Sequence, residues 1–265
     1  MVEALMRTTH LCIAAHHDDI EIMAPQPILE CFQSRDKWFT GVVVTDGRGS
    51  PRNGLYEKYR DEEMCLIRRN EQRKAAVIGD YAAQVLLDYP SKSVKDRANT
   101  SSVEDIFTVF KATSPGIVFT HNLADKHSTH IGVAVKVIAA VRRLPRDAQP
   151  KLLYGCEVWR GLDWLLDSEK VVLDCSDQSN LQAALLGVFD SQISGGKRYD
   201  LATMGRRVAN ATYFASHEVD DAKGLAYAMD LTPLIVEPEL DIQEYVQGHI
   251  DRFAQDVKTL ITSVM

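Results

Sequence analysis

Short apolar runs rich in β-branched residues alternate along this chain with longer segments whose apolar residues recur at helical spacing. The apolar runs predict strands at residues 11–15, 41–45, 84–87, 116–120, 152–158 and 171–173. The helical spacing predicts helices at residues 23–32, 59–78, 103–110, 131–141 and 181–189. Because strand and helix alternate, we expect an α/β fold with a Rossmann-like, mostly parallel sheet and helices on both faces.

The C-terminal part of the chain follows two other patterns. Residues 191–238 contain several glycines and Pro233 without one clear period, which predicts a loop-rich segment that serves as a lid or an oligomer contact. Residues 239–264 return to near-helical spacing of apolar positions, which predicts a packed terminal helix. Since no repeat, low-complexity run or linker interrupts the sequence, we expect one domain over residues 1–265.

Composition narrows the classes of partner. The 30 Lys and Arg residues against 37 Asp and Glu residues give a formal charge of -7, which disfavours nucleic acid and, to a smaller degree, a strongly anionic substrate. The five cysteines are widely spaced and form no C-x-x-C pair. No apolar stretch approaches the ~20 residues of a membrane span. We therefore expect a cytoplasmic protein, without a membrane span, that binds a small molecule and forms a homo-oligomer.

Histidines and acidic residues gather directly after two of the predicted strands. Residues 15–22 read AHHDDIEI and residues 121–130 read HNLADKHSTH. In a parallel sheet both segments lie at the carboxyl ends of strands, where such folds build their sites. Two imidazoles and one carboxylate, with a position left for water, are typical of a catalytic zinc site. Asp18 or Asp19 then remains to accept a proton, and His127 or His130 to stabilise an oxyanion or protonate a leaving group.

Other interpretations of these residues are weaker. A single His at a strand end is usually a hydrogen-bonded capping group, and an Asp pair before a helix is often an N-cap. Two such clusters at two strand ends together favour a site. The chain contains no G-x-G-x-x-G, no G-x-x-x-x-G-K-[ST] and no G-x-S-x-G sequence, so neither a dinucleotide, a P-loop nor a serine nucleophile is indicated.

The two clusters resemble the signatures of the LmbE-like, or PIG-L, zinc deacetylases. The family's A-H-P-D-D appears as AHHDD at residues 15–19, and its H-P-D-H appears as HSTH at residues 127–130. Its R-x-x-E helix is matched at residues 68–71, and its S-Q element at residues 191–192. The resemblance implies the Rossmann-like fold and one Zn²⁺ per chain.

Carried over residue by residue, the resemblance assigns the roles within the site. His16, Asp19 and His130 are implied to bind zinc, and Asp18 to be the general base. His127 is implied to assist the oxyanion or the departing amine. We expect His127 to act in its protonated form, so that activity falls at high pH.

The resemblance also indicates substrate contacts and two departures from the family pattern. Arg68 is expected to contact substrate, with Arg69 as the alternative, and Trp159 and Arg160 to line the sugar or acyl pocket. For Trp159 alone, a core or interface position is favoured over stacking on a sugar ring. His17 replaces the family's Pro and Thr129 the Asp of H-P-D-H. Because Thr129 offers only a hydroxyl, we expect Asp125 or a backbone carbonyl to orient the ligand His instead.

The function implied is removal of an N-acetyl group from an N-acetylglucosamine-containing substrate, an amino sugar or its conjugate, with release of acetate and a free amine. One alternative keeps the metal but changes the substrate to another N-acyl compound, such as an acyl amino acid or an antibiotic intermediate. A second alternative is a non-catalytic scaffold of the same fold. Measurement of metal content separates the scaffold from the two enzymes.

Overall fold

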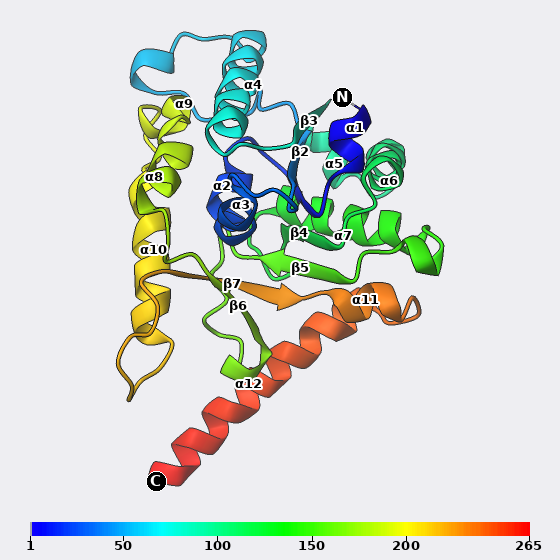
Figure 1. Ribbon diagram of the computed structural model, residues 1–265. Coiled ribbons are helices and arrows are strands. Elements are labelled where there is room, and N and C mark those ends of the chain that lie inside the picture. The colour runs from blue at the N-terminus through cyan, green and yellow to red at the C-terminus, as the bar shows by residue number, and fades with distance from the viewer. Residues whose placement is uncertain (1) are drawn as a thin grey trace.

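Five parallel strands make up most of a seven-stranded sheet in the computed structural model, which describes residues 2–265 (Figure 1). The strand order is β3-β2-β1-β4-β5-β7-β6. The parallel strands are β1 (His10–Ala14), β2 (Phe39–Thr45), β3 (Ala83–Tyr89), β4 (Ile117–His121) and β5 (Leu152–Cys156). β7 (Leu225–Asp230) pairs antiparallel with both β5 and β6 (Lys170–Asp174). The predicted α/β fold with a mostly parallel sheet is confirmed.

Helices cover both faces of this sheet, as the alternation along β1 shows. Leu11 and Ile13 pack into one core, while Cys12 and Ala14 pack into the other. The first core is covered by α6 (Ser101–Thr113), α7 (Ser128–Arg142) and α11 (Thr232–Val236). The second is covered by α2 (Asp19–Met23), α3 (Pro25–Cys31), α4 (Asp61–Ile78) and α8 (Ser179–Gly187). Both faces are therefore buried, as parallel sheets require.

The predicted helix at residues 23–32 forms as α3, and the residues before it form the separate helix α2. α2 ends at Met23, and α3 begins at Pro25 after Ala24. Proline is favoured at the first position of a helix because its missing N–H would have no partner there. Pro25 therefore begins a new helix. Short helices also form at α1 (Val2–Met6) and α5 (Ser91–Lys95).

The prediction that residues 191–238 are loop-rich is wrong. This segment forms α9 (Asp190–Ile193), α10 (Tyr199–Tyr213), β7 and α11. The buried residues of α10 are Thr203, Arg207 and Ala211, so the covered face of this helix is largely polar and gives no apolar period. Arg207 donates to the backbone carbonyl of Glu21 at 2.7 Å, which joins α10 to α2 by a polar contact.

The terminal helix forms as predicted, but most of it is not packed. In α12 (Ile242–Val264) the first turns contact the core, and from Ile250 onward every residue is exposed. Figure 1 shows the red helix leaving the body of the protein. Its apolar residues therefore form an exposed stripe at Ile250, Phe253, Val257, Leu260 and Val264. Neither α12 nor any other helix within residues 2–265 is both long and apolar enough to cross a membrane.

The direction in which successive strands are added to the sheet reverses once, beside β1. β1 lies between β2 and β4, so the connection that leaves β1 runs to one side and the chain returns on the other side at β4. A crevice opens at the carboxyl ends of the strands at such a point. The two histidine-rich segments follow β1 and β4 and therefore face each other across this crevice.

Candidate active site

The segment after β1 turns sharply, and the turn directs two adjacent carboxylates differently. Asp18 has a left-handed backbone conformation with φ 93°, which is costly for a residue with a Cβ. Its backbone N–H donates to Oε1 of Gln72 in α4 at 3.3 Å. Asp19 Oδ2 accepts the backbone N–H of His16 at 2.7 Å. The Asp18 side chain makes no capping hydrogen bond to α2, so it does not act as an N-cap.

Three candidate metal-binding atoms converge where the two segments meet. His16 Nδ1 lies 3.1 Å from Asp19 Oδ2 and 3.1 Å from His130 Nε2. Asp19 Oδ2 and His130 Nε2 are 3.3 Å apart. A tetrahedral zinc ion with bonds of about 2.0–2.1 Å holds its ligand atoms about 3.3 Å apart. The three predicted ligands therefore have the separations that a zinc ion needs.

Two neighbouring histidines offer alternative sets. His127 joins His16 and His130 in a group whose ligand atoms lie within 4.8 Å of one another, and His121 does the same with Asp19 and His130. His121 Nε2 accepts the backbone N–H of Ala15 at 2.8 Å, so the lone pair of that nitrogen is already used. His121 was not predicted as part of the site; its only signal in the sequence is its position at the end of a strand.

The charges of His130 and of the carboxylates of Asp19 and Asp125 stabilise one another. Burial lowers the pKa of His130, but Asp19 and Asp125 outweigh this and raise it to about 9. Burial raises the pKa of Asp19, but His130 and His16 outweigh this and hold it well below its usual value. Asp125 Oδ2 faces His130 Nδ1 at 3.5 Å, longer than a hydrogen bond, and Asp125 accepts the N–H groups of His127 and Trp159. The cluster thus already favours positive charge beside the Asp19 carboxylate.

Asp18 is held by a buried arginine. Arg68 of α4 is 1% exposed, and its guanidinium lies 3.1 Å from Asp18 Oδ2. Burial and the adjacent Asp19 raise the pKa of Asp18 to about 6, although Arg68 lowers it. Arg68 also donates to the carbonyl of His17 and, at 3.0 Å, to Glu71. The carboxyl group of Asp18 therefore exchanges its proton close to neutral pH.

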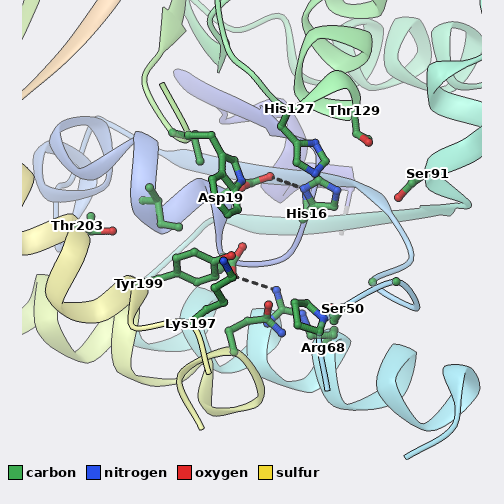
Figure 2. A pocket seen from close by; sticks show the side chains of 18 of the residues that line it. His16, Asp19, Ser50, Arg68, Ser91, His127, Thr129, Lys197, Tyr199 and Thr203 are labelled. Carbon is green, nitrogen blue, oxygen red and sulfur yellow. Dashed lines mark hydrogen bonds and ion pairs between the residues drawn. The ribbon is translucent and has the colours of Figure 1, made fainter. Parts of the chain in front are cut away.

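A cavity of about 660 Å³ opens beside these groups. Figure 2 shows His16, Asp19 and His127 together at this cavity, with Tyr199 and Lys197 beside them. Several of the predicted site residues contribute to the lining: His16, Asp18, Asp19, Arg68, His127 and Trp159. His130 is fully buried behind them, and Arg160 is exposed and does not line the cavity.

The sequence model of one protein family matches the N-terminal part of this chain. The PIG-L family, described as GlcNAc-PI de-N-acetylase, matches residues 11–141. This range contains β1, β4 and both segments that meet in the crevice. The chain carries a PIG-L family domain. No match was found among curated protein sequences.

Solved structures share the fold of this PIG-L protein at low sequence identity. The N,N'-diacetylchitobiose deacetylase of Pyrococcus horikoshii is 16% identical, with a TM-score of 0.67 over 87% of this chain and 86% of that chain. A deacetylase of the A40926 pseudoaglycone is 16% identical, with a TM-score of 0.62 over 84% and 97%. A 4-carboxy-2-hydroxymuconate hydratase of Pseudomonas putida is also 16% identical, with a TM-score of 0.65 over 84% and 96%. The fold alone therefore does not fix the reaction.

The PIG-L domain differs from our expectation at His127. Burial and the neighbouring His130 lower the pKa of His127 to about 4, so its imidazole is neutral near pH 7. This lowered pKa does not support the expectation that His127 acts in its protonated form. The ring centroids of His127 and His16 are 4.9 Å apart, which keeps His127 at the mouth of the candidate metal site.

Two further residues were assigned incompletely from the sequence. Ser191 of the S-Q element is fully buried and donates its hydroxyl to Glu71 at 2.7 Å. Arg68 donates to the same hydroxyl at 3.3 Å, so α9 supports the arginine that holds Asp18. Arg69, the alternative to Arg68, pairs with Asp88 at 2.7 Å and does not line the cavity.

Proposed function

We propose that this chain is a zinc-dependent N-deacetylase that removes an acetyl group from an N-acetylglucosamine-containing small molecule and releases acetate and a free amine. The observation that carries the proposal is the convergence of His16, Asp19 and His130 at one cavity, beside the Asp18 carboxylate that Arg68 holds. The family description supports amide hydrolysis on an amino sugar, and two of the structural neighbours are described as deacetylases.

His16, Asp19 and His130 would hold one zinc ion per chain. Their donor set of two imidazoles and one carboxylate suits zinc better than magnesium or calcium, which prefer oxygen ligands. When bound, zinc supplies a Lewis acid for the amide carbonyl and lowers the pKa of water toward neutrality. Asp125, which faces the far nitrogen of His130, would keep that ring oriented.

Asp18 is proposed as the group that moves the proton. With a pKa near 6, its carboxylate is ionised at neutral pH and accepts a proton from the attacking water. Water adds to the carbonyl carbon, the C–N bond breaks, and the same proton passes from Asp18 to the departing nitrogen. Arg68 fixes the carboxylate for both transfers; a direct contact between Arg68 and the substrate also stays a prediction.

His127 and Trp159 are proposed to act on the substrate itself. A neutral His127 ring still carries one N–H group, which would donate to the carbonyl oxygen as negative charge develops there. Trp159 is half-buried and lines the cavity, so its exposed ring offers a surface on which a sugar can stack.

The test measures amine release and bound zinc on the same sample. The panel comprises N-acetylglucosamine conjugates, chito-oligosaccharides, N-acyl amino acids and 4-carboxy-2-hydroxymuconate. We expect amine and acetate in equal amounts from an N-acetylglucosamine compound, with one zinc per chain. Hydrolysis of N-acyl amino acids alone would favour the second substrate class, and muconate hydration without amine release would contradict the deacetylase.

The number of domains, the cellular compartment and the oligomeric state are also proposals. We propose one domain over residues 1–265 in a cytoplasmic homo-oligomer. All five cysteines are free thiols, which is consistent with a reducing compartment. The exposed apolar stripe of α12 is the surface through which copies would associate.

A further inference from the structure

Three basic side chains line the cavity without ion-pair partners. Lys95, Lys197 and Arg206 have no carboxylate within 4.0 Å among residues 2–265. The only acidic residues in the lining are Asp18 and Asp19, which already face Arg68 and the histidines. In a chain with a net charge of -7, the lining of this cavity therefore carries more positive than negative side chains.

Two of these cations flank an aromatic wall. The Lys197 Nζ atom lies 5.1 Å from the centroid of the Trp159 ring. The rings of Trp159 and Tyr199 are nearly perpendicular, and their centroids are 6.1 Å apart. Arg206 of α10 donates to the carbonyl of Val158, the residue before Trp159. Figure 2 shows Lys197 and Tyr199 together beside the His16 and Asp19 side chains. The wall therefore combines a flat apolar surface with positive charge.

Arg206 has a buried acidic neighbour, Glu157, with which it forms no ion pair. The charge of Arg206 lowers the pKa of Glu157, which burial raises, and Glu157 Oε1 accepts from Asn210 and from the Tyr227 N–H. Its Oε2 accepts the Leu162 N–H at 3.0 Å. Both oxygens are therefore engaged elsewhere. The bond to Val158 holds the guanidinium in place, so little side-chain entropy is lost when it binds a ligand.

We propose that Lys197 and Arg206, which line the same cavity as Trp159, form a subsite for a carboxylate or phosphate group on the amine portion of the substrate. This inference rests on the proposed function, because the acetyl group is assigned to the side of the cavity at His16 and Asp19. An acetyl group fills only a small part of 660 Å³, so the rest of the substrate occupies the aromatic wall. Guanidinium and ammonium groups bind such anions through charge-assisted hydrogen bonds.

The subsite changes the expectation drawn from overall charge. The net negative charge of the chain disfavours a strongly anionic substrate only if the charges are spread evenly over its surface. Inside a cleft, the electrostatic potential is set mainly by the charged residues that line the cleft. Lys197 and Arg206 also lie outside residues 11–141, so the subsite belongs to the part of the chain beyond the family match.

The first test uses the deacetylated products, which bind without turnover. Calorimetry on the zinc-loaded chain compares glucosamine, glucosamine 1-phosphate and muramic acid. We expect at least one anionic amine to bind about tenfold or more tightly than glucosamine, since a hydrogen bond to a charged group has that effect on affinity. The phosphate and carboxylate ligands show which anion the subsite prefers.

Variants assign the effect to the subsite. Lys197→Gln should remove most of the preference for the anionic amine, because it should lower the affinity for that amine by a larger factor than the affinity for glucosamine. The matched control is Lys126→Gln, which removes an exposed lysine that does not line the cavity. Arg206→Gln should act like Lys197→Gln, and Arg206→Lys should restore part of the preference. Equal affinities for all three amines, or equal losses for charged and neutral amines in Lys197→Gln, would overturn the subsite.

Kinetics on the acetylated counterparts separate this inference from the proposed function. A Lys197-dependent preference in binding, without hydrolysis of any amide, would support the subsite and contradict the deacetylase. Hydrolysis of neutral and anionic amides with equal kcat/KM, together with equal product affinities, would support the deacetylase and overturn the subsite. We expect hydrolysis with the higher kcat/KM on the anionic amide.

Discussion

Glu21 provides a test of the structure that does not depend on catalysis. Its carboxyl group is 2% exposed, and its Oε1 accepts hydrogen bonds from the Tyr81 hydroxyl and from Gln72 Nε2, each at 2.8 Å. Burial raises the pKa of Glu21 to about 8, although these hydrogen bonds lower it. The ordinary pKa of an exposed Glu side chain is 4.5. Glu21 is therefore neutral in the folded chain and ionised in the unfolded chain at pH values between these two.

The sign of the pH dependence follows from proton binding. Between about pH 4.5 and about pH 8 the folded state holds one more proton at Glu21 than the unfolded state does. Its contribution to stability is therefore fully present below the unfolded pKa and is lost as pH rises through the folded pKa. The slope reaches about 1.4 kcal/mol per pH unit, or about 3 kcal/mol between about pH 5 and about pH 7.

The variant Glu21→Gln removes the titration but keeps an oxygen that can accept from Tyr81 and Gln72. We expect urea unfolding of chelator-treated protein to show that the stability of Glu21→Gln relative to wild type rises by about 3 kcal/mol over that range. The matched control is Glu62→Gln at an exposed position, whose stability relative to wild type should stay constant. Parallel stability profiles for wild type and Glu21→Gln would refute a buried, neutral Glu21.

Four further predictions concern the site and the assembly. Asp18→Asn should keep zinc and lose about a hundredfold or more in turnover, whereas Asp19→Asn should lose zinc; elemental analysis beside kinetics shows whether the two are reversed. His127→Ala should keep zinc and lose about two to three orders of magnitude in kcat, and loss of the metal in this variant would make His127 a ligand. Arg68→Ala should move the acid limb of the kcat profile to higher pH because Asp18 loses its counter-charge, and an unmoved limb would exclude that role. Phe253→Glu on α12 should lower the molar mass measured by light scattering, and an unchanged mass would exclude the stripe as a contact.

The parts of the fold that the sequence predicts are those whose signal is local. The strands at residues 11–15 and 116–120 are apolar on both faces, so their burial is evident without a partner. Their carboxyl ends place His16 and His130 on one edge, and this step needs only the parallel arrangement. The same reasoning fails for α10, whose buried Arg207 satisfies its charge with backbone oxygens of α2 far away in sequence.

The sequence does not reveal the residues that hold the site in place, because their contacts are with residues far away in the sequence. Gln72 contacts the backbone of Asp18 and the side chain of Glu21, yet a glutamine in the middle of a helix carries no signal of burial. Lys197 reads as an ordinary polar residue in a glycine-containing loop. Only the position of Trp159 beneath it shows that it belongs to the cavity.

The fold gives the two adjacent acidic residues of the AHHDD motif different protonation behaviour. Asp18 and Asp19 are chemically identical and both buried, yet the pKa of Asp18 is raised to about 6 while that of Asp19 is held well below its usual value. The left-handed backbone at Asp18 separates them, so that Asp19 faces His16 and His130 while Asp18 faces the single charge of Arg68. Two carboxyl groups with separated pKa values can divide their work, one as a permanent anion for a cation and the other as a proton carrier. A change that relaxed the backbone at Asp18 would therefore disturb both roles without replacing either carboxylate.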